Sequence, residues 1–114
     1  MPKFALLLHE SPHAYRDFSP EQIQAIIQKY IDWMNGLKAQ GRYLSGEKLC
    51  PESLIVRREG DGSLATDGPY MESKEVVGGL MIIEADSHDH AVELTRGSPH
   101  FDRGWIEIRR VDLA

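Results

Sequence analysis

Two long apolar runs constrain the possible folds of this chain more than any other sequence feature. Residues 3–8 (KFALLL) and residues 76–85 (VVGGLMIIEA) both have the composition of β-strands, and Leu80 to Ile83 form an unbroken apolar stretch. Runs of this kind are typical of strands that are buried on both faces. The sequence therefore predicts a sheet that has these two strands at its centre.

A helix is predicted between the two runs. Ser19 can cap the helix, Pro20 suits its first position, and Gln22 can complete a capping box. Apolar residues then recur at steps of three and four from Ile23 to Leu37, which predicts one apolar side, and Gly41 is expected to end the helix. A second, shorter helix is predicted from Asp86 or Ser87 to about Arg96.

The remaining segments predict further strands at residues 43–49, 53–58 and 105–111, with residues 63–66 as the return arm of a hairpin. The order β-α-β-β-α-β, with this extra hairpin arm, predicts an α+β fold with two helices on one face of an antiparallel sheet. The other face would then lack a cover. We therefore expect a homodimer that packs sheet against sheet.

Composition narrows the class of protein. A chain of 114 residues fits a single domain over residues 1–114, and a hydrophobic fraction of 41% with a charged fraction of 27% is ordinary for a globular protein. The net charge of −5 and the scattered basic residues argue against direct nucleic-acid binding. No run is long enough to cross a membrane, and the single Cys50 suits a reducing compartment, so we expect a cytoplasmic protein.

The segment from Thr66 to Gly79 (TDGPYMESKEVVGG) is unusually dense in turn-forming and charged residues. Asp67-Gly68-Pro69 predicts a turn, which Asp67 would tie by hydrogen bonds to the backbone. Gly78 and Gly79 stand where a strand should stiffen, which indicates a bulge or a close backbone approach. We expect an ordered loop that packs against the first helix, with the ring of Tyr70 as its anchor.

These motifs resemble the YCII-related family, and within it the subgroup named for a DGPF motif. The resemblance rests on Gly41-x-x-Leu44-x-Gly46-Glu47-x-Leu49, Thr66-Asp67-Gly68-Pro69-Tyr70-x-Glu72-x-Lys74-Glu75, Gly78-Gly79 and Glu107-Ile108-Arg109, with Tyr70 where the motif has Phe. It implies a ferredoxin-like fold that dimerises through its sheets into a barrel-like assembly, with a pocket for a small molecule. Some relatives look like enzymes in which a histidine on the first helix transfers a proton, and one branch eliminates chloride from a chlorinated aromatic. Tyr30 occupies that position here.

Several residues are candidates for the site, and each has a structural alternative. Tyr30 could act as a hydrogen-bond donor or acid, or it could be a core tyrosine. The carboxylates of Glu47, Asp67, Glu72 and Glu75 could do acid/base work or simply be exposed, and Lys74 could pair with a neighbouring glutamate on the surface. His9 and His100 lie near strand and helix ends, where pockets form, and Gly79 could let a ligand approach the backbone.

No residue pattern indicates a metal or a cofactor. His88 and His90 are two apart on the predicted helix and point to different sides, and Cys50 has no recognisable base partner. Glycine-rich phosphate loops and zinc motifs are absent from the sequence. We therefore expect a pocket protein of the proton-transfer or elimination type, with Tyr30, Glu47 and His100 as catalytic candidates and His9, Asp67, Tyr70, Glu75 and Gly79 as binding candidates. The alternative is an accessory or regulatory protein that acts with a sigma-factor partner, since the DGPF subgroup is often encoded beside sigma factors.

Overall fold

The computed structural model of the chain describes residues 2–71 and 75–112, and only the backbone of residues 69–71. The described part consists of β1 (Lys3–Glu10), α1 (Pro20–Ala39), β2 (Tyr43–Lys48), β3 (Glu52–Arg58), β4 (Leu64–Met71), β5 (Val76–Glu84), α2 (His88–Thr95), the short 3-10 helix η1 (Pro99–Asp102) and β6 (Gly104–Arg110). No helix in this part of the chain is long and apolar enough to span a membrane.

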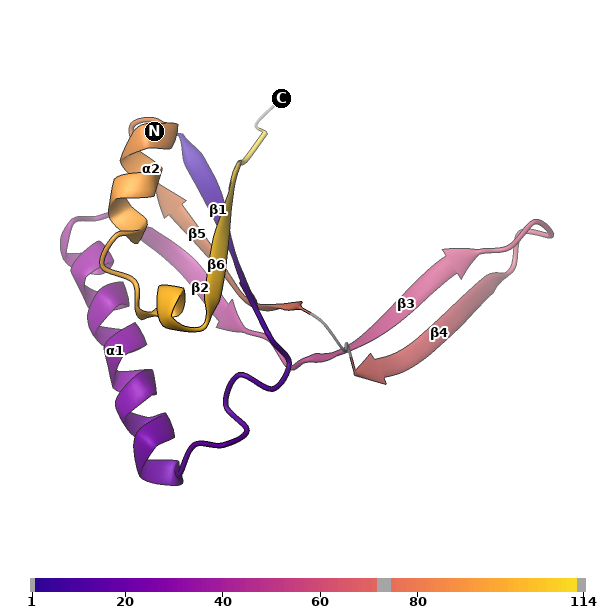
Figure 1. Cartoon of the computed structure of the whole chain (residues 1–114). Coiled ribbons are helices and arrows are strands. Elements are labelled where there is room, and N and C mark those ends of the chain that lie inside the picture. Colours follow the sequence, from indigo (N-terminus) through magenta and orange to yellow (C-terminus); the bar gives the residue numbers. More distant parts are fainter. Residues whose placement is uncertain (1, 72–74, 113–114) are drawn as a thin grey trace.

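Four of the strands form one antiparallel sheet in the order β2-β5-β1-β6. The two strands predicted at the centre, β1 and β5, lie there side by side. Helices α1 and α2 both lie on one face of this sheet (Figure 1). Together with the β-α-β-β-α-β order of these elements, the arrangement is a mixed α+β fold consistent with a ferredoxin-like fold.

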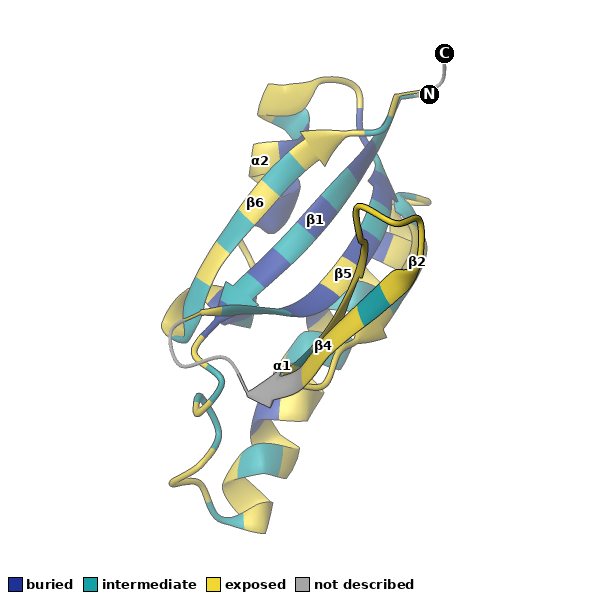
Figure 2. Cartoon of the chain, turned by 90° about the vertical axis from the view of Figure 1, so that its right-hand side faces the viewer, coloured by how far each residue is buried: buried dark blue, intermediate teal, exposed yellow. Residues whose placement is uncertain are grey.

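Burial alternates along β1. Phe4, Leu6, Leu8 and Glu10 are buried under the helices, whereas the residues between them are only half-buried (Figure 2). The prediction that this strand is buried on both faces is therefore wrong for the single chain. The reason is that no element covers the second face, and Leu80 of β5 accordingly remains 37% exposed. We call this second side of the sheet the open face.

The predicted start and end of α1 are confirmed. The Gln22 backbone N–H donates to Ser19 Oγ at 3.1 Å, and the Ser19 backbone N–H donates to Gln22 Oε1 at 2.8 Å, which completes the capping box. The helix ends at Ala39, and Gly41 follows with a φ of 70°, a value that favours glycine.

The C-terminal half of α1 packs into the core. Trp33 and Leu37 are buried there, and the Trp33 indole N–H donates to the Leu94 backbone oxygen of α2 at 3.0 Å. This bond satisfies the one polar atom of the indole in an apolar setting. Both helices are thereby held to the same face of the sheet.

The predicted turn at Asp67-Gly68-Pro69 is wrong, because β4 runs through these residues. Ile55 pairs with Asp67 and Ser53 pairs with Tyr70, so two residues of β4 lie opposite one residue of β3. This is a β-bulge, and Gly68 adopts a φ of 112° within it. A glycine with positive φ and a proline without an N–H suit a bulge as well as a turn, so the residue types alone do not separate the two.

Strands β3 and β4 form a separate two-stranded sheet, which we call the arm (residues 52–71). The arm extends away from α1 (Figure 1), so the expectation that the segment beginning at Thr66 packs against the first helix is wrong for its described residues. Glu72 and Lys74 lie outside the described residues, as does the ring of Tyr70.

Candidate functional site

A cavity of about 480 Å³ lies between α1 and the helix-covered face of the sheet. One wall is apolar and comes from the N-terminal half of α1, with Leu8 and Met81 on the sheet opposite. The members of the helix wall are Ile23, Ile26, Ile27, Ile31 and Met34. Because Ile27 faces this space and not a packed neighbour, it stays 43% exposed. The apolar side of α1 therefore lines the cavity in the N-terminal half of the helix and packs into the core in the C-terminal half.

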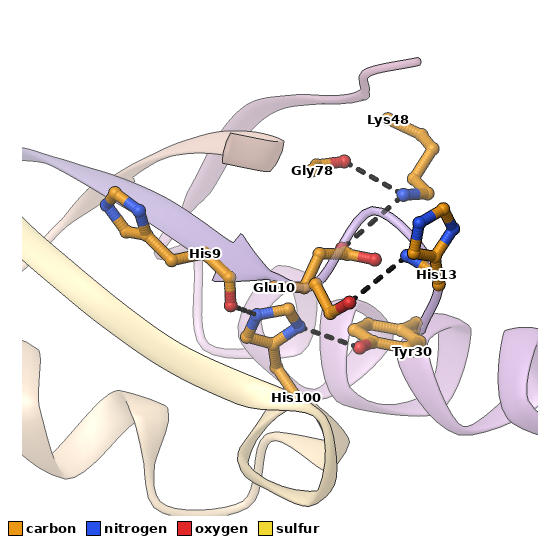
Figure 3. A network of polar contacts seen from close by, with 8 residues as sticks. His9, Glu10, His13, Tyr30, Lys48, Gly78 and His100 are labelled. Atoms are coloured by element: carbon orange, nitrogen blue, oxygen red, sulfur yellow. Dashed lines mark hydrogen bonds and ion pairs between the residues drawn. The ribbon is translucent and has the colours of Figure 1, made fainter. Parts of the chain in front are cut away.

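The other end of the cavity is polar and is built around His100. Tyr30 of α1 and His100 of η1 lie 70 residues apart in the chain, yet the Tyr30 hydroxyl is 2.8 Å from His100 Nδ1 (Figure 3). His100 is 1% exposed, and its backbone N–H donates to Ser98 Oγ at 3.1 Å, which caps η1. The short helix that begins at Pro99 thus fixes this histidine in place.

The partners of His100 define which ring nitrogen carries the proton. Nε2 lies 2.7 Å from the backbone oxygen of His9, and a carbonyl oxygen can only accept, so Nε2 donates. Burial is the main cause that lowers the pKa of His100 below its ordinary value, which keeps the ring neutral near pH 7. Nδ1 is then a lone-pair acceptor for the Tyr30 hydroxyl. His100 is held as a neutral base whose free lone pair points toward Tyr30.

Two tyrosines continue this network toward the cavity. Burial, followed by a hydrogen bond between its hydroxyl and Tyr30, raises the pKa of Tyr15. Burial likewise raises the pKa of Tyr30. Both hydroxyls therefore keep their protons at neutral pH. The Arg103 guanidinium lies 5.9 Å and 6.0 Å from the ring centroids of Tyr15 and Tyr30, which places a fixed positive charge beside them.

Glu10 provides a buried carboxylate at the same end of the cavity. Its side chain is 6% exposed, and Lys48 Nζ approaches its Oε1 at 3.5 Å while donating to the Gly78 backbone oxygen at 3.1 Å (Figure 3). A Cβ at Gly78 would overlap the Glu10 carboxyl group, so only glycine leaves room for it. Gly78 has no partner in the pairing of β1 with β5, where the register shifts between Leu8 and His9. The bulge that the Gly78-Gly79 pair predicts is therefore confirmed, and it accommodates Glu10.

The charges at this end do not cancel. In the lining, Glu10 and Lys48 carry opposite charges and His100 is neutral, and Arg103, which is not part of the lining, adds a positive charge beside the tyrosine rings. The Lys48 side chain is 63% exposed, so its ammonium group, although bonded to Gly78 and near Glu10, is accessible to a ligand. An apolar wall with a cationic end suits a small molecule that has an apolar body and an anionic group.

A second hollow lies over α1 and α2, with a volume of about 790 Å³. It is wider than the cavity, but its lining includes neither His100, Tyr30 nor Glu10. Perturbed titratable groups in a concavity are the better indicator of a functional site. We therefore place the candidate site in the smaller cavity.

The structure brings some of the sequence-predicted residues together. Tyr30 and His100 are in direct contact, and both line the cavity. His9 contributes only its backbone oxygen, because its ring lies on the open face, where it stacks on Trp105 and its Nε2 is 2.9 Å from Glu107 Oε1. The expectation that the His9 side chain belongs to the pocket is wrong, since the alternation of β1 sends it to the other face.

The remaining predicted residues are divided between the cavity and distant positions. Gly79 of β5 lines the cavity, and Glu47 of the edge strand β2 also borders it. Glu47 pairs with Leu80, however, so its carboxylate lies on the open-face side of the sheet and the expectation of a catalytic Glu47 in the pocket is wrong. Asp67 lies on the arm, paired with Ile55, and Glu75 is exposed at the start of β5, so neither belongs to the cavity lining. The backbone of Tyr70 is on the arm opposite Ser53, and its side chain lies outside the described residues.

Sequence reasoning missed Glu10, Tyr15, Lys48 and Arg103. For Glu10 a signal existed, because residues 4, 6, 8 and 10 of β1 share one face, and the first three are apolar. A carboxylate at the fourth position of a face that is otherwise apolar and buried indicates a buried charge, and so a candidate site residue. Tyr15 lies in an irregular loop, where no periodicity could place it.

The described residues include no group of three histidine, cysteine, aspartate or glutamate side chains placed to hold a metal ion. His90 Nδ1 accepts a hydrogen bond from the Asp86 backbone N–H at 2.9 Å, and the His88 ring meets Phe4 edge-on. Cys50 is exposed. These side chains have structural contacts or face solvent.

The sequence matches the YCII-related domain over residues 2–112, so the chain belongs to the YCII-related family. No protein with curated annotation matches it significantly. The family membership agrees with the α+β fold. The chemistry of the site must be argued from its own residues.

Proposed function

We propose that this protein is an enzyme that removes a proton from a small molecule held in the cavity, with His100 as the base acting through the Tyr30 hydroxyl. The observation that carries the proposal is the hydrogen-bonded chain from the Tyr30 hydroxyl to His100 Nδ1 and from His100 Nε2 to the His9 backbone oxygen. It fixes the tautomer, leaves Nδ1 able to take a proton, and places a hydroxyl between this nitrogen and the cavity.

The proton moves in two linked transfers. The Tyr30 oxygen accepts a proton from the substrate, and the Tyr30 hydroxyl proton moves to His100 Nδ1. The raised pKa of Tyr30 disfavours a free tyrosinate, so the phenol passes the proton on and does not store the charge. The imidazolium that forms is stabilised by the buried Glu10 carboxylate, whose charge raises the His100 pKa against the effect of burial.

The substrate class follows from the lining. The isoleucines of α1 suit an aromatic or branched aliphatic body, and Lys48 suits a carboxylate or an enolate oxygen. Negative charge that develops on the substrate after proton loss would lie near Lys48 and Arg103, where it is stabilised. Loss of a leaving group from that anion would make the overall reaction an elimination.

Phenylpyruvate tests the proton-transfer step, because it has an aromatic body, a carboxylate and an acidic CH₂ group. Exchange of this CH₂ group with D₂O is followed by proton NMR, with and without protein. The protein should accelerate exchange above the buffer rate, and His100→Gln should remove about a hundredfold or more of that acceleration. The Gln amide can still donate to the His9 oxygen, so the variant removes the base with little change in packing.

His88→Gln is the matched control, since His88 is exposed at the start of α2, away from the cavity. It should exchange phenylpyruvate at the wild-type rate. The proposed reaction is refuted if NMR shows that phenylpyruvate occupies the cavity but its CH₂ group exchanges at the buffer rate, or if His100→Gln exchanges it as fast as wild type.

Two finer assignments accompany this proposal. The sequence from Thr66 to Tyr70 supports placing the chain in the DGPF-motif subgroup of its family. The single exposed Cys50 supports a cytoplasmic location, where thiols stay reduced.

A further inference from the structure

The arm is the least compact part of the chain. Its strands β3 and β4 form a sheet only with each other. The radius of gyration of the chain is 16.5 Å, compared with about 13 Å for a compact domain of this length. A two-stranded ribbon that packs on nothing is only marginally stable in water. The arm therefore needs a surface to pack against.

One face of the arm, which we call its apolar face, carries three apolar side chains beside Arg58. Leu54 and Val56 alternate along β3, and Leu64 of β4 joins them because it pairs with Arg58, which is two residues after Val56. These three side chains are 57%, 55% and 64% exposed, respectively. Apolar side chains gathered on one face and exposed to this degree are typical of an interaction surface. Ile55, on the opposite face of β3, is less exposed at 37%.

The arm extends on the same side as the open face of the sheet. In Figure 1 the helices lie on one side of the four-stranded sheet and the arm projects from the other. In the perpendicular view of Figure 2, β4 lies in front of the sheet and the helices lie behind it. The open face also carries apolar side chains, with Leu80 37% and Trp105 49% exposed. The chain thus has two uncovered apolar surfaces on one side.

A homodimer that packs sheet against sheet on the open face is already expected from the sequence. We propose that the arm is a clasp in this dimer: the apolar face of each arm packs against the other copy. A copy seated on the open face must lie beside the arm that projects from that side. Two-fold symmetry then places the arm of the second copy against the first, so one association covers all the uncovered surfaces.

The charge of the arm favours a protein as its occupant over a membrane. The arm has four acidic residues and two basic ones, and Glu59 and Asp61 lie at its tip. Its net negative charge would oppose an anionic lipid surface. A second copy of the chain is the simplest protein occupant, because it brings its own open face and the apolar face of its own arm to the interface.

Photo-crosslinking in a mixture of ¹⁴N-labelled and ¹⁵N-labelled protein tests the clasp. Benzoylphenylalanine replaces Val56 in the full chain, or Arg57 as the control on the opposite face, and equal amounts of ¹⁴N and ¹⁵N protein are mixed before illumination. Mass spectrometry then separates crosslinks within one chain from crosslinks between two. Position 56 should give mixed-isotope crosslinks at least several-fold more often than position 57.

A second measurement tests the energetic part. The triple variant Leu54→Asp, Val56→Asp and Leu64→Asp should raise the dimer dissociation constant by at least about tenfold in sedimentation, whereas Ile55→Asp should leave it within about twofold. A far-ultraviolet circular dichroism spectrum like that of wild type would show that the triple variant is folded.

The outcomes are distinguishable. A monomeric wild-type chain at high micromolar concentration overturns the proposal. So does a dimer that forms no mixed crosslinks at position 56 and keeps its dissociation constant in the triple variant, although such a dimer could still pack through the open face. Neither result depends on whether the cavity is catalytic.

Discussion

Tyr30→Phe tests the polar network directly, because it removes one hydroxyl and keeps the ring. That hydroxyl donates to Nδ1 of His100 at 2.8 Å, and His100 is 1% exposed. Water has little access to His100 Nδ1, so in the variant this buried acceptor is left without a hydrogen-bond donor. We expect the free energy of unfolding to fall by about 1–3 kcal/mol. Tyr15, which also bonds to this hydroxyl, loses a partner and places the expected value in the upper part of that range.

Urea denaturation followed by tryptophan fluorescence measures this change, since the buried Trp33 reports loss of the core. Tyr43→Phe is the matched control. Tyr43 lines the same cavity, and within the described residues its hydroxyl makes no hydrogen bond, so its loss should change stability by less than about 0.5 kcal/mol. Equal unfolding midpoints for the two variants would refute the assignment of Tyr30 as the donor to His100.

Three further predictions concern other parts of the structure. His100 has a lowered pKa in the folded state, so below about pH 6.5 the unfolded chain binds more protons, and the stability of wild type should fall relative to His100→Gln by up to about 1.4 kcal/mol per pH unit in urea titrations from pH 7 to 5; a pH-independent difference would contradict a neutral buried ring. Gly78→Ala should displace the Glu10 carboxylate and cost about 1–3 kcal/mol in thermal unfolding, whereas Gly97→Ala, where a Cβ meets nothing within 4 Å, should cost less than about 0.5 kcal/mol; equal costs would show that Glu10 is not packed against Gly78. Ser19→Ala removes the cap of α1 and should cost about 1 kcal/mol by circular dichroism melting, and no loss would argue against the capping box.

The resemblance of this chain to a family and the chemistry of its site rest on different kinds of information. The motifs at residues 41–49 and 66–79 identify the family from sequence, but Asp67 and Glu75 in the second motif are not part of the cavity lining. The residues that do form the polar end come from β1, the loop after it, α1, β2 and η1. The two motifs therefore mark the cavity only in part, because Lys48 and Gly78 line it whereas Asp67 and Glu75 do not.

The sequence by itself determined the elements that depend on neighbours in the chain. The capping box at Ser19, the glycine after α1, and the apolar runs of β1 and β5 act through local hydrogen bonds and periodicity, so their positions could be predicted. Only the tertiary structure decided what these elements do together. The bulge in β4 depends on its pairing with β3, and the burial of Glu10 depends on Gly78, which lies far along the chain. The contact between Tyr30 and His100 likewise needs α1 and η1 to meet at one end of the sheet, because long-range packing places side chains that no local pattern can bring together.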